Sequence, residues 1–183
     1  MKRCTPLPHN FLLILVLKES LGMFKTQIFF LLSLLVLSCK KKETNSIEDT
    51  TVRLYEVYAA RTDFEQFLSF YDNEMVLEDF IFGERIVGKA NFRAFFDWPN
   101  PKFQLLEDSA LVVEDITASG NKAIVSGYFT RFKWGDHTTE RMHFTTILEF
   151  NADGKIVKHQ DWINYPNTLI DYNKRKNSND WLK

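Results

Sequence analysis

Cysteine is nearly absent from this chain of 183 residues, and both cysteines, Cys4 and Cys39, lie in its first quarter. Beyond Cys39 there is no thiol for a disulfide or for nucleophilic catalysis, so both are excluded for residues 40–183. Glycine is also scarce, and Gly83 and Gly88 are too isolated to form a phosphate-binding loop. We therefore expect a protein that works without a bound cofactor.

Long hydrophobic runs are missing too. The main apolar run, residues 28–37, has ten residues, which suits the core of a signal peptide but is half of the roughly 20 needed to span a bilayer. A second run, Phe11 to Val16, is separated from it by the charged Lys18, Glu19 and Lys25. Charges are costly in hydrocarbon, so one long uncleaved anchor is disfavoured.

The end of the main run, Val36-Leu37-Ser38-Cys39, resembles the lipobox of a bacterial lipoprotein signal. The resemblance implies that Cys39 becomes the lipid-bearing N-terminus, which anchors the protein to a membrane of the bacterial cell envelope. Two apolar runs are unusual for one signal peptide. The simplest explanation is that translation starts at Met23 and that residues 1–22 are an upstream over-extension of the reading frame. The expected divisions are a leader (1–38), a lipidated tether (39–46), a folded domain (47–172) and a polar C-terminal tail (173–183).

An excess of basic side chains is also lacking. Residues 39–183 carry 19 basic and 23 acidic side chains, a net charge of −4, and the basic ones are scattered. Nucleic-acid-binding domains instead gather lysine and arginine on one face, so no nucleic acid partner is expected. Lys40 to Lys42 are better suited to lie beside lipid head groups.

Hydrophobic periodicity predicts three helices. Residues 47–61 place apolar side chains on one face, and the stretch from Phe64 to Tyr71 has them at i, i+3, i+4 and i+7. Thr62 precedes Glu65 by three residues, the spacing of a capping box. The third helix is expected over Lys89–Phe96.

From Phe103 onwards the pattern has period two, which is typical of strands. Helices followed by an antiparallel meander indicate an α+β fold. We expect a cone-shaped α+β barrel in which three helices pack on a curved, mostly antiparallel sheet with an aromatic lining. The expected strands are Met75–Phe80, Arg85–Val87, Leu105–Thr117, Ala123–Trp134, Thr138–Phe150 and Ile156–Ile163.

Five segments resemble, in their order and spacing, the nuclear transport factor 2-like superfamily, which includes ketosteroid isomerases, scytalone dehydratase and SnoaL-like polyketide cyclases. The resemblance covers nearly all of residues 47–165. It implies the cone-shaped fold and a possible homodimer through the open sheet face, but this fold hosts many activities and many plain binders. The segments are Tyr55 to Phe64, Phe70-Tyr71-Asp72, Val76 to Asp79, Gly88 to Phe96 and Phe150 to Ile156.

The resemblance to ketosteroid isomerases implies that Tyr55 and Asp79 are catalytic. A carboxylate takes a proton from the carbon beside a carbonyl group, and a phenol stabilises the resulting oxyanion. Where these isomerases place a second acid, this chain has Thr146, a weaker partner for an oxyanion, so steroid isomerisation is not expected. Asp79 and Tyr55 also suit purely structural roles, as a turn aspartate and a core tyrosine.

The last strand contains His159-Gln160-Asp161-Trp162, and period two places His159 and Asp161 on one face. SnoaL-like proteins carry a similar polar pattern there. By resemblance Asp161 is the main candidate for a catalytic or ligand-orienting group, with His159 beside it. No metal site is expected, because the histidine spacings match no tight ligand pattern. The candidate pocket residues are Tyr58, Tyr128, Phe144, Thr146 and Trp162.

Two function classes follow, and the sequence leaves open whether the protein is an enzyme. The first is a membrane-tethered domain that binds a small hydrophobic molecule in an aromatic cone, with cofactor-independent isomerase, dehydratase or cyclase chemistry. The second is a non-catalytic binding or protein-interaction module of the same fold.

Overall fold

A six-stranded sheet forms the frame of residues 46–182, the part of the chain that the computed structural model describes. The elements are α2 (Ile47–Ala60), α3 (Phe64–Ser69), β1 (Tyr71–Asp79), β2 (Glu84–Val87), α4 (Lys89–Phe96), β3 (Phe103–Leu105), β4 (Leu111–Ser119), β5 (Lys122–Phe129), β6 (Phe132–Trp134), β7 (His137–Thr139), β8 (Met142–Phe150), β9 (Ile156–Ile163) and the 3-10 helix η1 (Ser178–Trp181).

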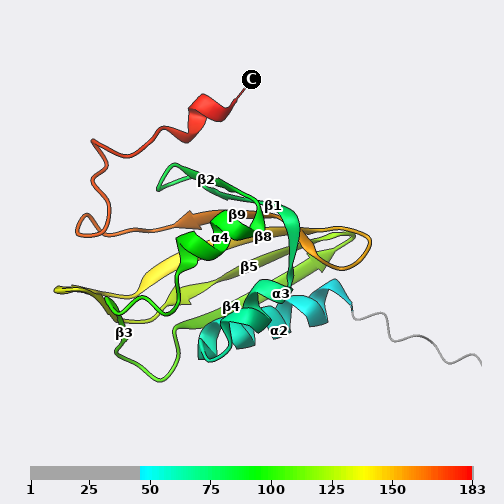
Figure 1. Ribbon diagram of the computed structural model, residues 1–183, viewed down its shortest axis with the longest axis horizontal. Helices are drawn as coiled ribbons and strands as arrows, with labels where there is room; N and C mark the ends of the chain where they lie inside the picture. Colours follow the sequence, from blue (N-terminus) through cyan, green and yellow to red (C-terminus); the bar gives the residue numbers. More distant parts are fainter. Residues whose placement is uncertain (1–45, 183) are drawn as a thin grey trace, which may run out of the picture. The chain divides into compact units, whose positions relative to one another are not determined.

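The strand order of the main sheet is β2-β1-β9-β8-β5-β4 (Figure 1). Its pairings are antiparallel except that between β1 and β9, which is parallel. The expected α+β class, with three helices and a mostly antiparallel sheet, is confirmed. A second sheet, β3-β6-β7, has three short strands.

The helix boundaries follow from local capping. Ser46 caps α2: its hydroxyl accepts from the Asp49 amide at 3.0 Å, and the Asp49 carboxylate accepts from the Ser46 amide at 3.2 Å. The capping box expected at Thr62 is wrong by one residue, because Asp63 caps α3 and accepts from the Gln66 amide at 2.8 Å.

Tertiary pairing ends α3 earlier than its apolar stripe suggests. The helix stops at Ser69, although the stripe continues to Tyr71. The Phe70 carbonyl accepts from the Ile156 amide at 2.9 Å, and Tyr71 pairs with Ile156 at the start of β1. The strand partner therefore takes the backbone groups that a further helical turn would use.

Three of the four strands expected after Phe103 are each broken in two, whereas the fourth, Ile156–Ile163, is the single strand β9. The Thr130 amide donates to the Ala110 carbonyl, and the Leu106 amide donates to the Arg131 carbonyl, both at 3.1 Å. These bonds lead the chain from β5 into β6, where it pairs with β3. Period two continues through the break, so periodicity alone did not reveal the change of sheet.

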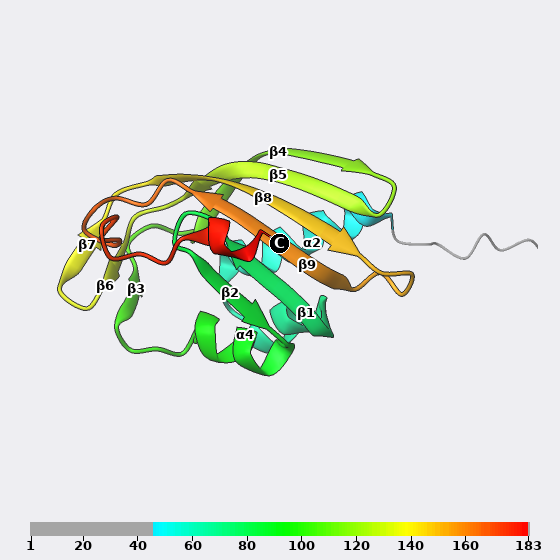
Figure 2. The ribbon, with the colours of Figure 1, turned by 90° about the horizontal axis from the view of Figure 1, so that it is seen from above.

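The core lies between the helices and one face of the main sheet, which we call the inner face. Figure 2 shows the six strands side by side, with α4 beneath the β1–β2 end. We call the face of the sheet that points away from the helices the outer face. The helices and the inner face contribute fully buried side chains to one hydrophobic cluster, among them Leu54, Phe67, Phe92, Leu77, Val125 and Leu148.

None of the helices within residues 46–182 has the length and apolar character that crossing a bilayer requires. Cys39 and the expected leader, 1–38, lie outside the described residues. Of the expected tether, 39–46, only Ser46 is described.

Candidate functional site

Two buried carboxylates lie side by side on the inner face. Asp79 ends β1 and Asp161 lies in β9, and they are direct partners in the parallel β1–β9 pairing. Their exposed fractions are 2 % and 8 %. Partners in adjacent strands project to the same side of a sheet, so both side chains face the helices. We call Asp79 and Asp161 the acidic pair.

A chain of hydrogen bonds holds Asp161. The Thr146 hydroxyl donates to Asp161 Oδ1 at 2.5 Å, and His159 Nε2 lies 3.0 Å from the same oxygen. On the other side of the imidazole, His159 Nδ1 lies 3.0 Å from the Tyr71 hydroxyl. With Asp161 as a carboxylate acceptor, Nε2 carries the hydrogen and Nδ1 accepts from Tyr71. Within residues 46–182 no hydrogen bond is made to Asp161 Oδ2.

Tyr55 reaches the same place from α2. Its buried ring stacks on Phe144, with ring centroids 5.9 Å apart and planes at 9°. Burial, and secondly the charge of Asp161, raise the pKa of Tyr55 well above the ordinary value, while a hydrogen bond with the Thr146 side chain opposes the rise. The phenol is therefore a neutral hydrogen-bond donor at physiological pH.

Asp79 is held differently. Its Oδ1 accepts from the backbone amides of Ile81, at 3.0 Å, and Phe82, at 2.7 Å, and its Oδ2 accepts from the Tyr165 hydroxyl at 2.5 Å. Burial raises the pKa of Asp79, and the charge of Asp161 adds to the rise, whereas the bonds from Tyr165 and the two amides oppose it. Asp79 therefore binds its proton more tightly than an ordinary aspartate does.

This arrangement suits proton transfer. Two neighbouring carboxyl groups in different surroundings are the usual way in which a site separates an acid from a base. Asp161 keeps Oδ2 unbound, the pKa of Asp79 is raised by burial, and Tyr55 supplies a neutral donor. These are the parts needed to move a proton next to a carbonyl group.

Aromatic rings fill the space between α2 and the inner face. Tyr58 stacks on Trp98, with ring centroids 5.9 Å apart, and contacts Phe67 and Phe129 at 5.0 Å and 6.0 Å. Burial raises the pKa of Tyr58, so this phenol also stays neutral. The indole Nε1 of Trp98 is buried and has no hydrogen-bond partner within the described part of the chain.

The open hollows of the surface lie elsewhere. One of about 560 Å³ is lined by residues that include Arg61, Phe64, Arg93 and Trp98. A smaller one, of about 230 Å³, lies beside Phe82. Neither of these two hollows is lined by the acidic pair.

The structure gathers most of the expected site residues. Tyr55, Thr146, His159 and the acidic pair form the polar cluster, and Tyr58 and Phe144 belong to the aromatic core around it. Cys39, the expected lipid attachment site, lies outside the described residues.

Two expected pocket residues do not line the interior. Tyr128 pairs with His143, and Trp162 pairs with Thr145, on the outer face, and Trp162 is 39 % exposed. The expectation was wrong because side chains alternate along a strand. Trp162 has the parity of Gln160 rather than that of Asp161, and Phe129, next to Tyr128, is the residue that contacts Phe144.

Tyr165 is the site residue that sequence reasoning missed. It follows the last strand, where no periodic pattern indicates which way a side chain points. Tyr71 was noticed in a helical stripe and in a segment that resembles the superfamily, but not as a site residue. Its bond to His159 depends on its place at the start of β1.

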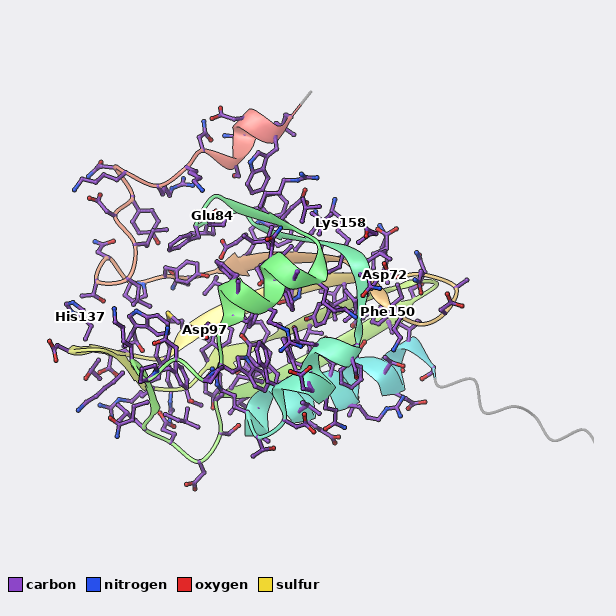
Figure 3. The ribbon with its side chains drawn as sticks, viewed as in Figure 1. Asp72, Glu84, Asp97, His137, Phe150 and Lys158 are labelled. Carbon is purple, nitrogen blue, oxygen red and sulfur yellow. The ribbon has the colours of Figure 1, made fainter. Side chains whose placement is uncertain are left out.

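No group of three or more His, Cys, Asp or Glu side chains within residues 46–182 is arranged to hold a metal ion. His143 faces outward opposite Tyr128, and His137 lies at the tip of the small sheet (Figure 3).

The chain belongs to the SnoaL-like domain family, whose model matches residues 51–159. No curated protein matches it. Among solved structures it is similar to a candidate SnoaL-like polyketide cyclase of Shewanella putrefaciens, with 14 % identity, a TM-score of 0.55, and coverage of 67 % of this chain and 93 % of that one.

Two further structures have other named activities. A candidate ketosteroid isomerase of Kribbella flavida has 23 % identity and a TM-score of 0.50, over 66 % of this chain and 78 % of that one. An LEH-like epoxide hydrolase of M. tuberculosis has 15 % identity and a TM-score of 0.53, over 66 % and 84 %. At these identities the likeness concerns the fold alone, which is related to those of cyclases, isomerases and epoxide hydrolases.

Proposed function

We propose that this SnoaL-like domain binds a small, largely apolar carbonyl compound between α2 and the inner face, and performs acid–base chemistry on it without a cofactor. One observation carries the proposal. Asp161 is buried and fixed through Oδ1 by Thr146 and His159, while Oδ2 is left without a hydrogen bond among residues 46–182. The Asp161 side chain keeps 12 % of its surface exposed, and Oδ2 is not a fully buried atom, so this oxygen is accessible to a ligand.

In the proposed reaction Asp161 Oδ2 takes a proton from the carbon next to the substrate's carbonyl group. The electron pair of the broken C–H bond moves to the carbonyl oxygen, and a hydrogen bond from the Tyr55 phenol stabilises the resulting enolate. Return of the proton to another carbon gives an isomer. Attack of the enolate carbon on a second carbonyl group, with the proton passed to the new alkoxide, closes a ring.

The test is mass spectrometry of small molecules that co-purify with the protein, together with turnover of candidate carbonyl substrates. We expect Asp161→Asn to lower turnover by at least about a hundredfold, the usual contribution of general base catalysis. Asp153→Asn is the matched control, because Asp153 is exposed in the β8–β9 turn. If Asp161→Asn and Asp79→Asn alter neither ligand retention nor turnover, the proposal is wrong.

The structure also supports a binding role without catalysis. Tyr165 already satisfies Asp79 Oδ2, and aromatic side chains fill the interior. Under this second candidate function, the apolar molecule is retained equally by the wild-type protein and by Asp161→Asn, with no turnover by either.

We further propose that the domain is tethered to a membrane of the bacterial cell envelope through a lipid on Cys39. The support is the lipobox-like sequence before Cys39 and the lysines after it. Replacing Cys39 with serine should release the protein into the soluble fraction without changing its unfolding temperature. A Cys39→Ser variant that stays with membranes would contradict the tether.

A further inference from the structure

The segment after β9, residues 164–182, runs back over the turn between β1 and β2, and we call it the C-terminal strap (Figure 1). Lys176 Nζ lies 2.7 Å and 2.8 Å from the Glu84 carboxylate oxygens. Ser178 Oγ donates to the Phe80 carbonyl at 3.0 Å, and the Trp181 ring lies 5.7 Å from that of Phe80. The segment expected to be a polar tail is therefore attached to the β1–β2 hairpin, at residues that follow Asp79.

Tyr165, near the start of the strap, lies against Asp79. The Tyr165 ring packs edge-on to Phe82, with centroids 5.7 Å apart, and the Tyr172 hydroxyl donates to the Tyr165 carbonyl at 2.7 Å. Since the Ile81 and Phe82 amides take Asp79 Oδ1, Oδ2 is the oxygen left for a ligand, and the Tyr165 hydroxyl occupies it.

We propose that Tyr165 occludes the site. Its phenol donates to Asp79 Oδ2, the position that a hydroxyl group of the ligand would otherwise take. The ligand binds when Tyr165 moves aside. The inference rests on the proposed function, and it names the ligand class as an apolar molecule that carries a neutral hydroxyl donor.

The charges around Asp79 support this class of ligand. Asp161 faces the same space from β9, so an anionic ligand would meet two carboxylates. A phenol or enol is neutral, can donate to Oδ2 as Tyr165 does, and has an apolar body that suits Phe82 and the aromatic interior.

The test is fluorescence titration with 2-naphthol, an apolar phenol, of the wild-type protein and of Tyr165→Phe. Phenylalanine keeps the ring but gives up the bond to Oδ2, so the ligand no longer competes with an internal donor. We expect 2-naphthol to bind Tyr165→Phe about five- to tenfold more tightly, the equivalent of one net hydrogen bond. Tyr128→Phe makes the same chemical change on the outer face and should bind as the wild type does.

Two variants separate this inference from the proposed function. Asp79→Asn should remove the gain when combined with Tyr165→Phe. If Asp79→Asn weakens binding but Tyr165→Phe does not strengthen it, occlusion is overturned while binding at the acidic pair stands. If no variant binds 2-naphthol, the inference is overturned, whereas the proposed function is decided by retention and turnover of carbonyl compounds in Asp161→Asn and Asp79→Asn.

A second measurement requires no ligand. Because the bond from Tyr165 lowers the pKa of Asp79, its loss should raise that pKa further in Tyr165→Phe, as followed by carboxyl NMR titration. An unchanged pKa would show that the contact does not form in solution, and would overturn the proposal whatever the binding result.

Discussion

Titration of Asp79 should make the stability of the folded protein depend on pH. Burial raises its pKa in the folded state, whereas an aspartate in an unfolded chain titrates at about 3.9. The folded state therefore holds the proton more tightly. The stability gained from protonation is present below the unfolded pKa and is lost as the pH rises through the folded pKa.

Asp79→Asn should remove this pH-dependent loss. We expect the free energy of unfolding in urea to fall less between about pH 4 and about pH 7 in the variant than in the wild type. Asp153→Asn, in an exposed turn, should keep the wild-type dependence. Equal slopes for Asp79→Asn and the wild type would mean that Asp79 titrates normally in the folded protein.

Thr146 is the second residue with a measurable role, because its hydroxyl is one of two partners of Asp161 Oδ1. Thr146→Val keeps the shape but leaves a buried carboxylate short of a donor, which should cost about 1–3 kcal/mol in the free energy of unfolding. Thr146→Ser keeps the hydroxyl and should recover most of that loss. Equal losses in both variants would assign the effect to packing instead of the hydrogen bond.

At the scale of elements, Gly83 is a position where the strap lies tightly against the β1–β2 turn. Its φ is +78°, and a Cβ there would lie 2.1 Å from the Lys176 carbonyl oxygen. Any side chain at this position must displace the strap as well as adopt an unfavourable backbone conformation.

Gly83→Ala should therefore loosen the strap. We expect faster tryptic cleavage at Lys174 and Lys176 and a loss of stability greater than that of Gly135→Ala. Gly135 is a matched control, because its φ is +61° and no atom lies within 4 Å of an added Cβ; its substitution carries only the backbone cost, about 1–2 kcal/mol. Similar cleavage rates in the two variants would show that the strap does not depend on the contact at Gly83.

At the scale of the whole molecule, the outer face carries exposed apolar side chains, including Val112, Ile124 and Trp162. A homodimer through this face, implied by the resemblance to the superfamily, stays a prediction. Ile124→Lys should reduce the mass in light scattering to that of a monomer, because a desolvated lysine opposes association. Val52→Lys, a similar change on α2, should not alter the mass, and a wild type that is already monomeric would contradict the dimer.

The predictable part of the site lies inside regular elements. Period two placed His159 and Asp161 on one face because a strand alternates regardless of its neighbours. The resemblance added Tyr55 and Asp79, and the structure brings both close to Asp161. Sequence reasoning failed at Trp162, which was expected in the pocket although its position in the alternating strand places it on the outer face. It also missed Tyr165, which follows the last strand.

By itself the sequence determined the α+β class, the boundaries of α2 and α4 and the face shared by His159 and Asp161, because capping and periodicity act over a few residues. Only the tertiary structure decided that α3 ends where β9 takes its carbonyl, that the strands after Phe103 divide between two sheets, and that Tyr165 meets Asp79. Those contacts join segments up to 86 residues apart. Their partners are selected by packing and by the need to satisfy buried polar groups, which no local pattern records.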